Sequence, residues 1–310
     1  MQVEEELAKL SAERDMLLTI GVFDGVHLGH RHLISRLTEL ARKQGLASGV
    51  VTFAQHPQEV LSPQTRLPFL TNLAQRTKLL KEAGVEVIIT LSFTPELARL
   101  SPRQFLEKLK KYLRMRGLVV GPDFALGQNR EGDVDNLSRL GEEMGFSVTV
   151  VPPLTIDGQV VSSTAIRKAL ASGDMKRAQS LIGRPFRLQG RVTSGAKRGA
   201  ELGFPTANLE ASPQQAIPAE GVYASRVHID NQAHPAMTNI GQRPTFGESQ
   251  RVVEVYLLDY HGDLYKQELT VDIIERLRGE IKFDSPEELK QQIAKDVKQG
   301  TAILKTRGGN

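Results

Sequence analysis

The sequence contains no cysteine among its 310 residues, which excludes disulfide bonds, thiolate zinc sites and a cysteine nucleophile together. It also contains no apolar run near the ~18 residues that a membrane-spanning helix needs. The first residues, MQVEEELAKLSAERDMLL, are acidic and helix-like rather than basic and then apolar, so they do not resemble a signal peptide. We therefore expect a cytoplasmic protein with no membrane partner.

Aromatic residues are scarce at 5%, and no block of five or more lysines and arginines occurs. The sequence thus lacks the usual features of a nucleic-acid-binding protein. The net charge of +4 and the pI near 9.2 suit anionic partners, and small phosphorylated substrates fit that charge equally well. The composition predicts no particular oligomeric state.

The length indicates two domains, because 310 residues exceed the usual ~100–200 residues of one domain. In the first half, apolar strands alternate with amphipathic helices, which predicts an α/β domain with a parallel sheet. Ligands of such sheets bind beyond the carboxyl ends of the strands. The expected strands are 17–23, 46–53, 85–91, 117–120 and 146–151, and the expected helices include 72–83, 102–115 and 134–144.

The pattern changes after two helix-like segments, 163–171 and 174–182. Short strands then follow one another without helices between them, which predicts a small antiparallel β-barrel. A terminal helix is expected from Pro286 to about residue 304, with Ser285 as its N-cap. The expected strands are 186–192, 222–229, 235–240, 252–258 and 269–274. We place the domain boundary between 183 and 184, giving domains 1–183 and 184–310.

The stretch TIGVFDGVHLGH, residues 19–30, carries two of the 7 histidines. The strand in this stretch is expected to end at Phe23, and His30 is expected to begin a helix. Between them, Gly25 and Gly29 allow a tight turn. Helix N-termini favour phosphate, so His27 and His30 fit as donors to the phosphates of a nucleotide. The alternatives are a capped turn with incidental histidines, or a metal site, for which no third ligand lies nearby.

Two further strings in the first half are polar. GPDFALGQNREGD, residues 121–133, is either a ligand-binding loop or a connection. SSTAIR, residues 162–167, can cap a helix and reach a phosphate with the guanidinium of Arg167. A plain N-cap with a solvated arginine is the alternative.

GVFDGVHLGH, TFAQHP, GPDFALG and SSTAIR, in this order and spacing, resemble the N-terminal module of the bacterial bifunctional riboflavin kinase/FMN adenylyltransferases (FAD synthetases). The resemblance implies a Rossmann-like nucleotidyltransferase domain over residues 15–182, in which the histidines bind the phosphates of ATP. The implied flavin-binding residues are His56, Asp123 and Phe124. The implied ATP-binding residues are Gly21, Phe23, Asp24, Gly25, His27, Gly29, His30, Ser163, Thr164 and Arg167.

In the second half, GRVTSGAKRGAELGFPTANL, residues 190–209, combines glycines with a positively charged tip. It is either a phosphate-covering flap or a hairpin with solvated charges. In the PTAN string, Thr206 and Asn208 would point the same way in an extended chain and offer oxygens that suit Mg²⁺–ATP. Glu254 lies in the strand-like VVEVYLLD, where it either faces solvent or acts as a general base.

These strings, with GVYAS, NIGQRPTFG, LYKQELTV and KFDSPEEL, resemble the riboflavin kinase module of the same family, over residues 184–305. The resemblance implies that Thr206 and Asn208 bind the metal and that Glu254 activates the 5′-hydroxyl of riboflavin. The implied ATP-binding residues are Gly195, Lys197, Gly203, Pro205, Thr206 and Asn208. The sequence departs from the family at Gln55, Ala200, Tyr256 and Lys266, where the family commonly has Pro, Arg, His and Gly.

We therefore expect a bifunctional enzyme that uses ATP and Mg²⁺ to convert riboflavin to FMN and then FMN to FAD. Three alternatives stay open at this point. One activity could be lost, the chain could bind flavin without turnover, or it could adenylylate some other phosphate.

Overall fold

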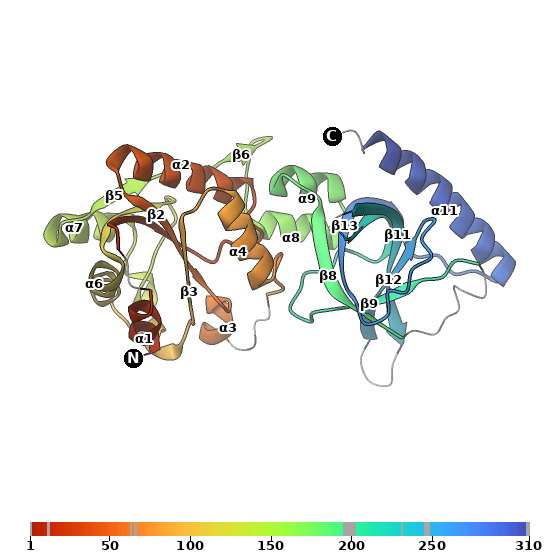
Figure 1. Ribbon diagram of the computed structural model, residues 1–310, viewed down its shortest axis with the longest axis horizontal. Helices are drawn as coiled ribbons and strands as arrows, with labels where there is room; N and C mark the ends of the chain where they lie inside the picture. The colour runs from red at the N-terminus through yellow and green to blue at the C-terminus, as the bar shows by residue number, and fades with distance from the viewer. Residues whose placement is uncertain are drawn as a thin grey trace. The chain divides into compact units, whose positions relative to one another are not determined.

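The computed structural model describes residues 2–10, 13–62, 64, 67–194, 203–230, 232–244 and 249–307. The chain forms two compact units, Met1–Ser163 and Thr164–Asn310 (Figure 1). The units divide before the predicted boundary at 183/184, since helices α8 (Ser163–Ser172) and α9 (Met175–Ile182) group with the second unit. The boundary between the two activities stays a prediction.

The first unit is built on a five-stranded parallel sheet in the order β3-β2-β1-β4-β5, which confirms the predicted α/β fold. Every residue of β1 and β2 is buried, as expected for a parallel sheet covered on both faces. The strands are β1 (Met16–Ile20), β2 (Ala47–Phe53), β3 (Val87–Leu91), β4 (Met115–Val120) and β5 (Ser147–Val150). A small hairpin, β6 (Thr155–Ile156) and β7 (Gln159–Val160), follows β5.

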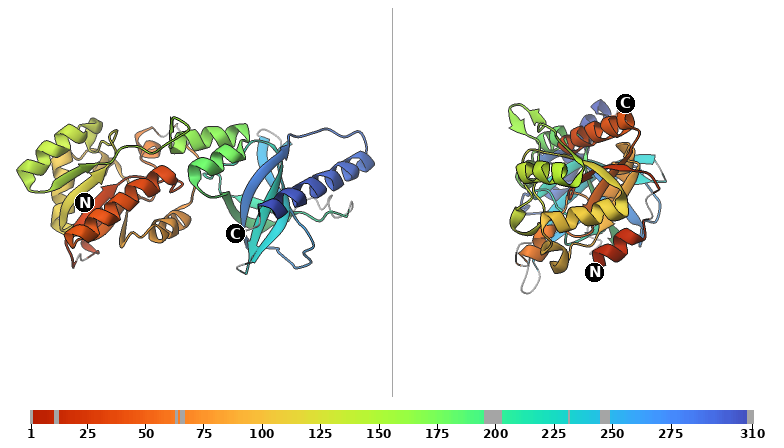
Figure 2. Two further views of the ribbon diagram at one scale, coloured as in Figure 1. Left: turned by 90° about the horizontal axis from the view of Figure 1, so that it is seen from above. Right: turned by 90° about the vertical axis from the view of Figure 1, so that its left-hand side faces the viewer.

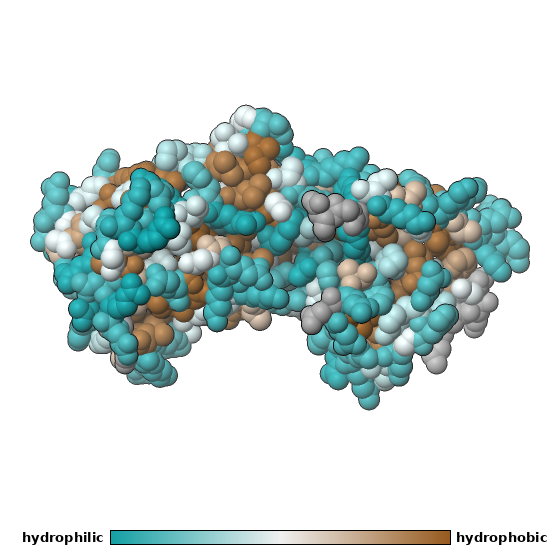
Figure 3. All heavy atoms as spheres, turned by 45° about the horizontal axis from the view of Figure 1, so that its top comes forward, coloured by the Kyte–Doolittle hydropathy of each residue, from teal (hydrophilic) through white to brown (hydrophobic). Residues whose placement is uncertain are grey.

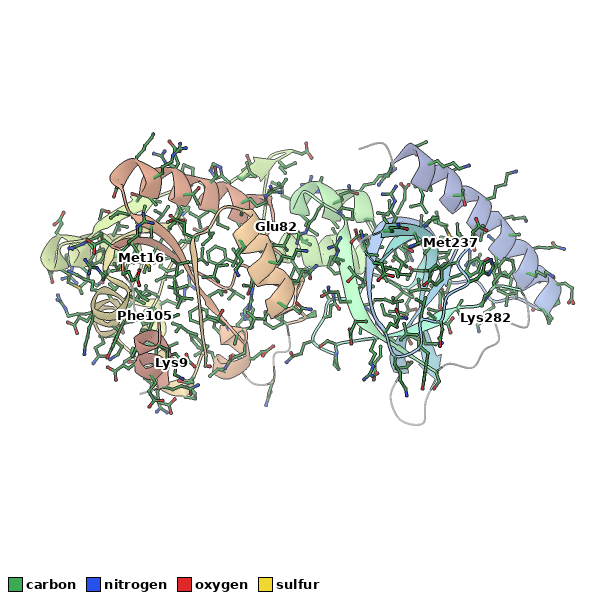
Figure 4. All side chains as sticks on the ribbon, viewed as in Figure 1. Lys9, Met16, Glu82, Phe105, Met237 and Lys282 are labelled. Carbon is green, nitrogen blue, oxygen red and sulfur yellow. The ribbon has the colours of Figure 1, made fainter. Side chains whose placement is uncertain are left out.

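Helices cover both faces of this sheet (Figure 2). Alternate strand residues point to opposite faces, so Leu17 belongs to one apolar cluster with α2 and α4, and Leu18 to another with α1, α6 and α7. Met16 and Phe105 lie in the second cluster (Figure 4). The helices are α1 (Gln2–Ala8), α2 (Leu28–Gln44), α3 (Pro57–Leu61), α4 (Leu73–Glu82), α5 (Pro95–Ala98), α6 (Pro102–Leu113) and α7 (Val134–Met144).

The second unit contains a closed six-stranded antiparallel barrel in the order β10-β11-β12-β9-β8-β13. A terminal helix, α11 (Pro286–Thr306), packs on its outer surface and is capped by Ser285 as predicted. The sequence did not indicate strand β9. The strands are β8 (Phe186–Thr193), β9 (Ala207–Ala211), β10 (Gly221–Ile229), β11 (Gln232–Pro244), β12 (Ser249–Leu257) and β13 (Glu268–Arg278).

Polar residues predominate on the face of the molecule shown in Figure 3, and hydrophobic residues are interspersed among them. Among the described residues, no helix combines the length and the hydropathy that crossing a membrane requires.

Candidate active sites

The turn after β1 carries the two histidines, and the helix that follows begins at Leu28 rather than at His30 as predicted. His27 is the N-cap: its backbone is extended, and its Nδ1 accepts a hydrogen bond from the N–H of His30 at 3.2 Å. A histidine cap is not among the usual capping residues, which explains the misplaced start. Within the described part of the chain, the N–H groups of Leu28 and Gly29 have no hydrogen-bond partner. The start of α2 therefore presents two donors and the positive end of the helix dipole to an anion.

The imidazole rings of His27 and His30 stack, with centroids 3.6 Å apart and planes inclined by 17°. The edge of Phe23 contacts the His30 ring at 5.2 Å. His30 Nδ1 is buried and has no hydrogen-bond partner among the described residues. Burial, followed by the neighbouring His27 and the charge of Arg76, lowers the pKa of His30 well below its usual value near 6.5. His30 is therefore a neutral ring at pH 7.

The proton of neutral His27 can be assigned from the same hydrogen bond. Since Nδ1 accepts from the His30 N–H, Nε2 carries the proton when the ring is neutral. A neutral His27 is thus a donor at Nε2, and its role at a phosphate stays a prediction.

Asp24 lies within the same turn, and its carboxylate is hydrogen-bonded to backbone groups of the protein. It accepts hydrogen bonds from the N–H groups of Leu70, at 2.9 Å, and Thr71, at 3.1 Å. The hydroxyl of Thr71 in turn accepts from the N–H of Gly25 at 3.0 Å. Because Asp24 is only 3% exposed and accepts these bonds, its carboxylate holds the turn against the 70–71 loop. Its role at ATP stays a prediction.

Arg76 of α4 was missed by the sequence analysis, yet it is the largest fully buried side chain of this unit. Its guanidinium donates to the carbonyl of Val22 at 3.0 Å and to that of Phe53 at 2.6 Å, which lie just beyond β1 and at the end of β2. Burial lowers the pKa of Arg76, and the nearby Asp24 raises it. Arg76 therefore joins two strand ends beneath the histidine turn.

Residues 161–163 pack against the same turn. Ser163 Oγ donates to the carbonyl of Asp24 at 3.0 Å, and a Cβ on Gly29 would lie 3.0 Å from the carbonyl oxygen of Val161. Only glycine fits without displacement at that position. Thr164 and Arg167 follow in α8 but belong to the second compact unit, so their place at the phosphates stays a prediction.

The predicted flavin-binding residues follow β2 and β4. His56 caps α3, since its Nδ1 accepts from the N–H of Gln58 at 3.2 Å. Phe124 packs on the apolar cluster of α6 and α7, whereas Asp123 is exposed. β4 adjoins β1 on the side opposite β2, so the loops after β1 and β4 flank the topological switch point, where ligands of open parallel sheets bind. The flavin role of these residues stays a prediction.

In the barrel, Glu254 of β12 is paired in register with Asn208 of β9 on one side and with Asn239 of β11 on the other. The adjacent residues Val253 and Val255 are 1% and 0% exposed and fill the interior. Since successive strand residues point to opposite faces, Glu254 and both asparagines lie on the outer face. Thr206, just before β9, is exposed. The predicted base and the predicted metal-binding amide are thus neighbours.

The departures from the family pattern have varied settings. Lys266 has a left-handed backbone with φ of 66°, a conformation that a glycine adopts without strain. Tyr256 packs its ring edge against Phe204 at 5.5 Å, and Gln55 donates to the carbonyl of Phe93 at 3.2 Å. Gly203 and Pro205 precede β9, and Gly203 has φ of 89°. Gly195, Lys197 and Ala200 lie outside the described residues.

Comparisons with known proteins match both halves of the chain. The family model for FAD synthetase matches residues 9–165, and the model for riboflavin kinase matches residues 182–304. A protein of Pseudomonas fluorescens named bifunctional riboflavin kinase/FMN adenylyltransferase is 41% identical over 98% of both chains. One of Escherichia coli (strain K12) with the same name is 40% identical over 90% of both.

A solved structure from Streptococcus pneumoniae, titled a macrolide-efflux protein, is similar over 96% of both chains, with a TM-score of 0.88 and 31% identity. It shares the fold along nearly the whole chain. Both family models, and relatives that share identity over nearly their full length, show that this chain belongs to the family of bifunctional riboflavin kinase/FMN adenylyltransferases.

Proposed function

We propose that this chain makes FAD from riboflavin in two ATP-dependent steps, each at its own site. The observation that carries the proposal is the placement of Glu254 directly beside Asn208 on the barrel, in a chain whose other unit has two histidines at a helix start. The first arrangement suits phosphorylation of an alcohol. The second suits a reaction between phosphates, which needs no base.

In the barrel, Glu254 accepts the proton of the riboflavin 5′-hydroxyl as that oxygen bonds to the γ-phosphorus of ATP. The bond from that phosphorus to the bridging oxygen breaks, and ADP leaves with FMN as the product. Thr206 and Asn208 offer a hydroxyl and an amide oxygen, ligands that fit Mg²⁺. When bound, Mg²⁺ would neutralise charge on the phosphates of ATP.

In the α/β unit, an oxygen of the FMN phosphate bonds to the α-phosphorus of ATP, and pyrophosphate leaves. The nucleophile is already ionised, so the residues have only to bind and neutralise charge. The rings of His27 and His30 and the N–H groups of Leu28 and Gly29 are donors for that purpose. Ser163, Thr164 and Arg167 are expected to contribute to the same phosphates. We also predict a cytoplasmic enzyme, from the sequence alone.

The test is to incubate the purified chain with riboflavin, ATP and Mg²⁺ and to separate the flavins by chromatography. FMN and then FAD are expected, and the appearance of neither would refute the proposal. His30→Ala should stop the sequence at FMN. Glu254→Ala should block FMN formation but leave FAD formation from supplied FMN intact.

If both variants impair the same step, the assignment of one reaction to each site is wrong. A flavin-binding protein without catalysis is the competing hypothesis. It predicts riboflavin binding, measured by fluorescence quenching, without consumption of ATP.

A further inference from the structure

The string NIGQRPTFG has no role in the proposed reactions so far, although its first residue lies beside the proposed base. Asn239 is paired with Glu254 across β11 and β12, and Glu254 is paired with Asn208 across β12 and β9. Directly opposed side chains of antiparallel strands have Cβ atoms about 4.5–5.5 Å apart. The three residues therefore form one row, with the carboxylate between two amides.

This row faces outward and keeps its hydrogen-bonding capacity. Thr238 and Ile240, on either side of Asn239, are 0% exposed, which places Asn239 on the outer face with Glu254. All three side chains of the row are half-buried. Within the described residues, none of the three has a side-chain hydrogen bond or ion pair. Half-buried amides and a carboxylate without protein partners are suited to a polar ligand.

The row ends at Asn239. Val222 of β10, the residue paired with Asn239 on its other side, is apolar. Arg278 of β13, which is paired with Val222, is bound to Asp296 by hydrogen bonds of 2.8 to 3.1 Å. Asn239 is thus the last group on this side of Glu254 with unused donors and acceptors.

Two features border the row. α11 covers the neighbouring row on the Met237 side, since a Cβ on Gly300 would meet the sulfur of Met237 at 2.4 Å (Figure 4). On the other side lies the Glu280 carboxylate, which occupies the space that a side chain at position 241 would need: its Oε1 is 2.2 Å from the position of a Cβ added to Gly241. The Nδ2 atom of Asn239 is 3.8 Å from that Cβ position. A ligand on the row is therefore confined along the line of the three residues.

We propose that Asn239 binds the ribityl chain of riboflavin next to the hydroxyl that is phosphorylated, and so selects the phosphoryl acceptor. This inference rests on the proposed function. Asn208 is on the ATP side of Glu254, and the acceptor and the leaving group of a phosphoryl transfer lie on opposite sides of the phosphorus. The acceptor therefore approaches on the Asn239 side.

The chemistry of an amide fits that role. A ribityl hydroxyl both donates and accepts a hydrogen bond, and an asparagine side chain offers an NH₂ donor and a carbonyl acceptor. The amide is also uncharged, so it does not repel Glu254.

The test compares Asn239→Ala and Asn239→Asp with the wild type in riboflavin kinase assays. Gln232→Ala serves as a matched control, because it removes an exposed amide from the start of the same strand. Asn239→Ala should raise the KM for riboflavin about tenfold, the effect expected for one lost hydrogen bond. The KM for ATP and the formation of FAD from FMN should not change.

A riboflavin analogue that lacks the ribityl hydroxyl next to the reacting one distinguishes a direct contact of Asn239 with the substrate from a structural effect of the substitution. Wild type should use it about tenfold less efficiently than riboflavin, and Asn239→Ala should lose most of that discrimination. Asn239→Asp has nearly the same shape and places a second carboxylate beside Glu254. The acidic limb of its kinase pH profile should therefore move to higher pH.

The outcomes distinguish a failure of the proposed function from a failure of the role proposed for Asn239. A wild-type chain that makes no FMN refutes the proposed function itself. A wild type that makes FMN while both Asn239 variants keep its riboflavin KM and its discrimination against the analogue refutes only the role of Asn239. If Asn239→Ala does not fold, Asn239→Asp decides through the same riboflavin KM, analogue discrimination and pH profile.

Discussion

The imidazole rings of His27 and His30 lie parallel at 3.6 Å, and the Nδ1 of the first accepts the backbone N–H of the second. Two protonated rings at that separation would repel each other, and burial lowers the pKa of His30, so His30 is the neutral ring of the pair. The positive charge beneath the turn comes from Arg76, which stays charged at any physiological pH. The turn thus combines neutral donors with a fixed cation, a combination suited to phosphates.

Replacing His30 by asparagine should make stability less dependent on pH below about 6.5, the ordinary pKa of histidine. His30 has a lowered pKa in the folded chain, so only the unfolded chain takes up this proton as the pH falls. As the pH falls, the free energy of unfolding of the wild type should therefore decrease by up to about 1.4 kcal/mol per pH unit relative to that of the variant. Urea unfolding at neutral and acidic pH, followed by circular dichroism, measures the difference.

His32→Asn is the matched control for that experiment, because His32 is an exposed residue of the same helix. It should show the pH dependence of the wild type. Parallel curves for wild type and His30→Asn would contradict the assignment of His30 as a neutral buried ring.

Arg76→Met should destabilise the first unit by about 2–4 kcal/mol, because it leaves two carbonyls and the Asp24 carboxylate without their buried cation. Arg31→Met, at an exposed position of α2, should change the free energy of unfolding by less than about 0.5 kcal/mol. Urea unfolding of both variants checks this. Equal stabilities would show that the buried guanidinium contributes nothing. Formation of FAD from FMN should fall in Arg76→Met while riboflavin phosphorylation persists.

Helices with regular signals were predictable from the sequence. α7 was predicted with its observed bounds, Val134–Met144, because its apolar positions recur regularly and it is capped by Asp133 and Gly145. α4 likewise has Asn72 as its N-cap, at the predicted start. Local patterns and capping residues were sufficient for these elements.

Elements and residues that depend on distant partners were not predictable. β9 has five residues and one buried apolar side chain, Leu209, and it exists because β8 and β12 pair with it. Arg76 lies in a string, LAQRTKLL, that looks like a solvent-facing helix. Its partners are 23 and 54 residues away in the chain. The bond that Asp24 accepts from a residue 46 positions further along the chain was likewise not predictable from the local sequence.

Asp272→Asn should destabilise the barrel by about 1–2 kcal/mol, a value reduced because its partners are partly exposed. The Asp272 carboxylate accepts two bonds from Arg187, at 2.6 and 2.8 Å, and one from His228 at 2.7 Å. These bonds join β8, β10 and β13. Thermal unfolding measures the effect, with Glu143→Gln as a control for a more exposed ion-pair cluster. Similar melting temperatures for the two variants would show that the Asp272 cluster adds no stability.

Lys266→Gly should be more stable than Lys266→Ala by about 0.5–1 kcal/mol, because only glycine adopts the left-handed backbone of this position without strain. The turn is fixed on both sides: Asp263 accepts the N–H of Tyr265 at 2.9 Å, and the N–H of Lys266 donates to Val192 at 3.0 Å. Comparing glycine with alanine removes the lysine side chain from both variants, so the difference reports the backbone alone. Urea unfolding measures it, and an alanine variant as stable as the glycine variant would show that φ of 66° costs nothing here.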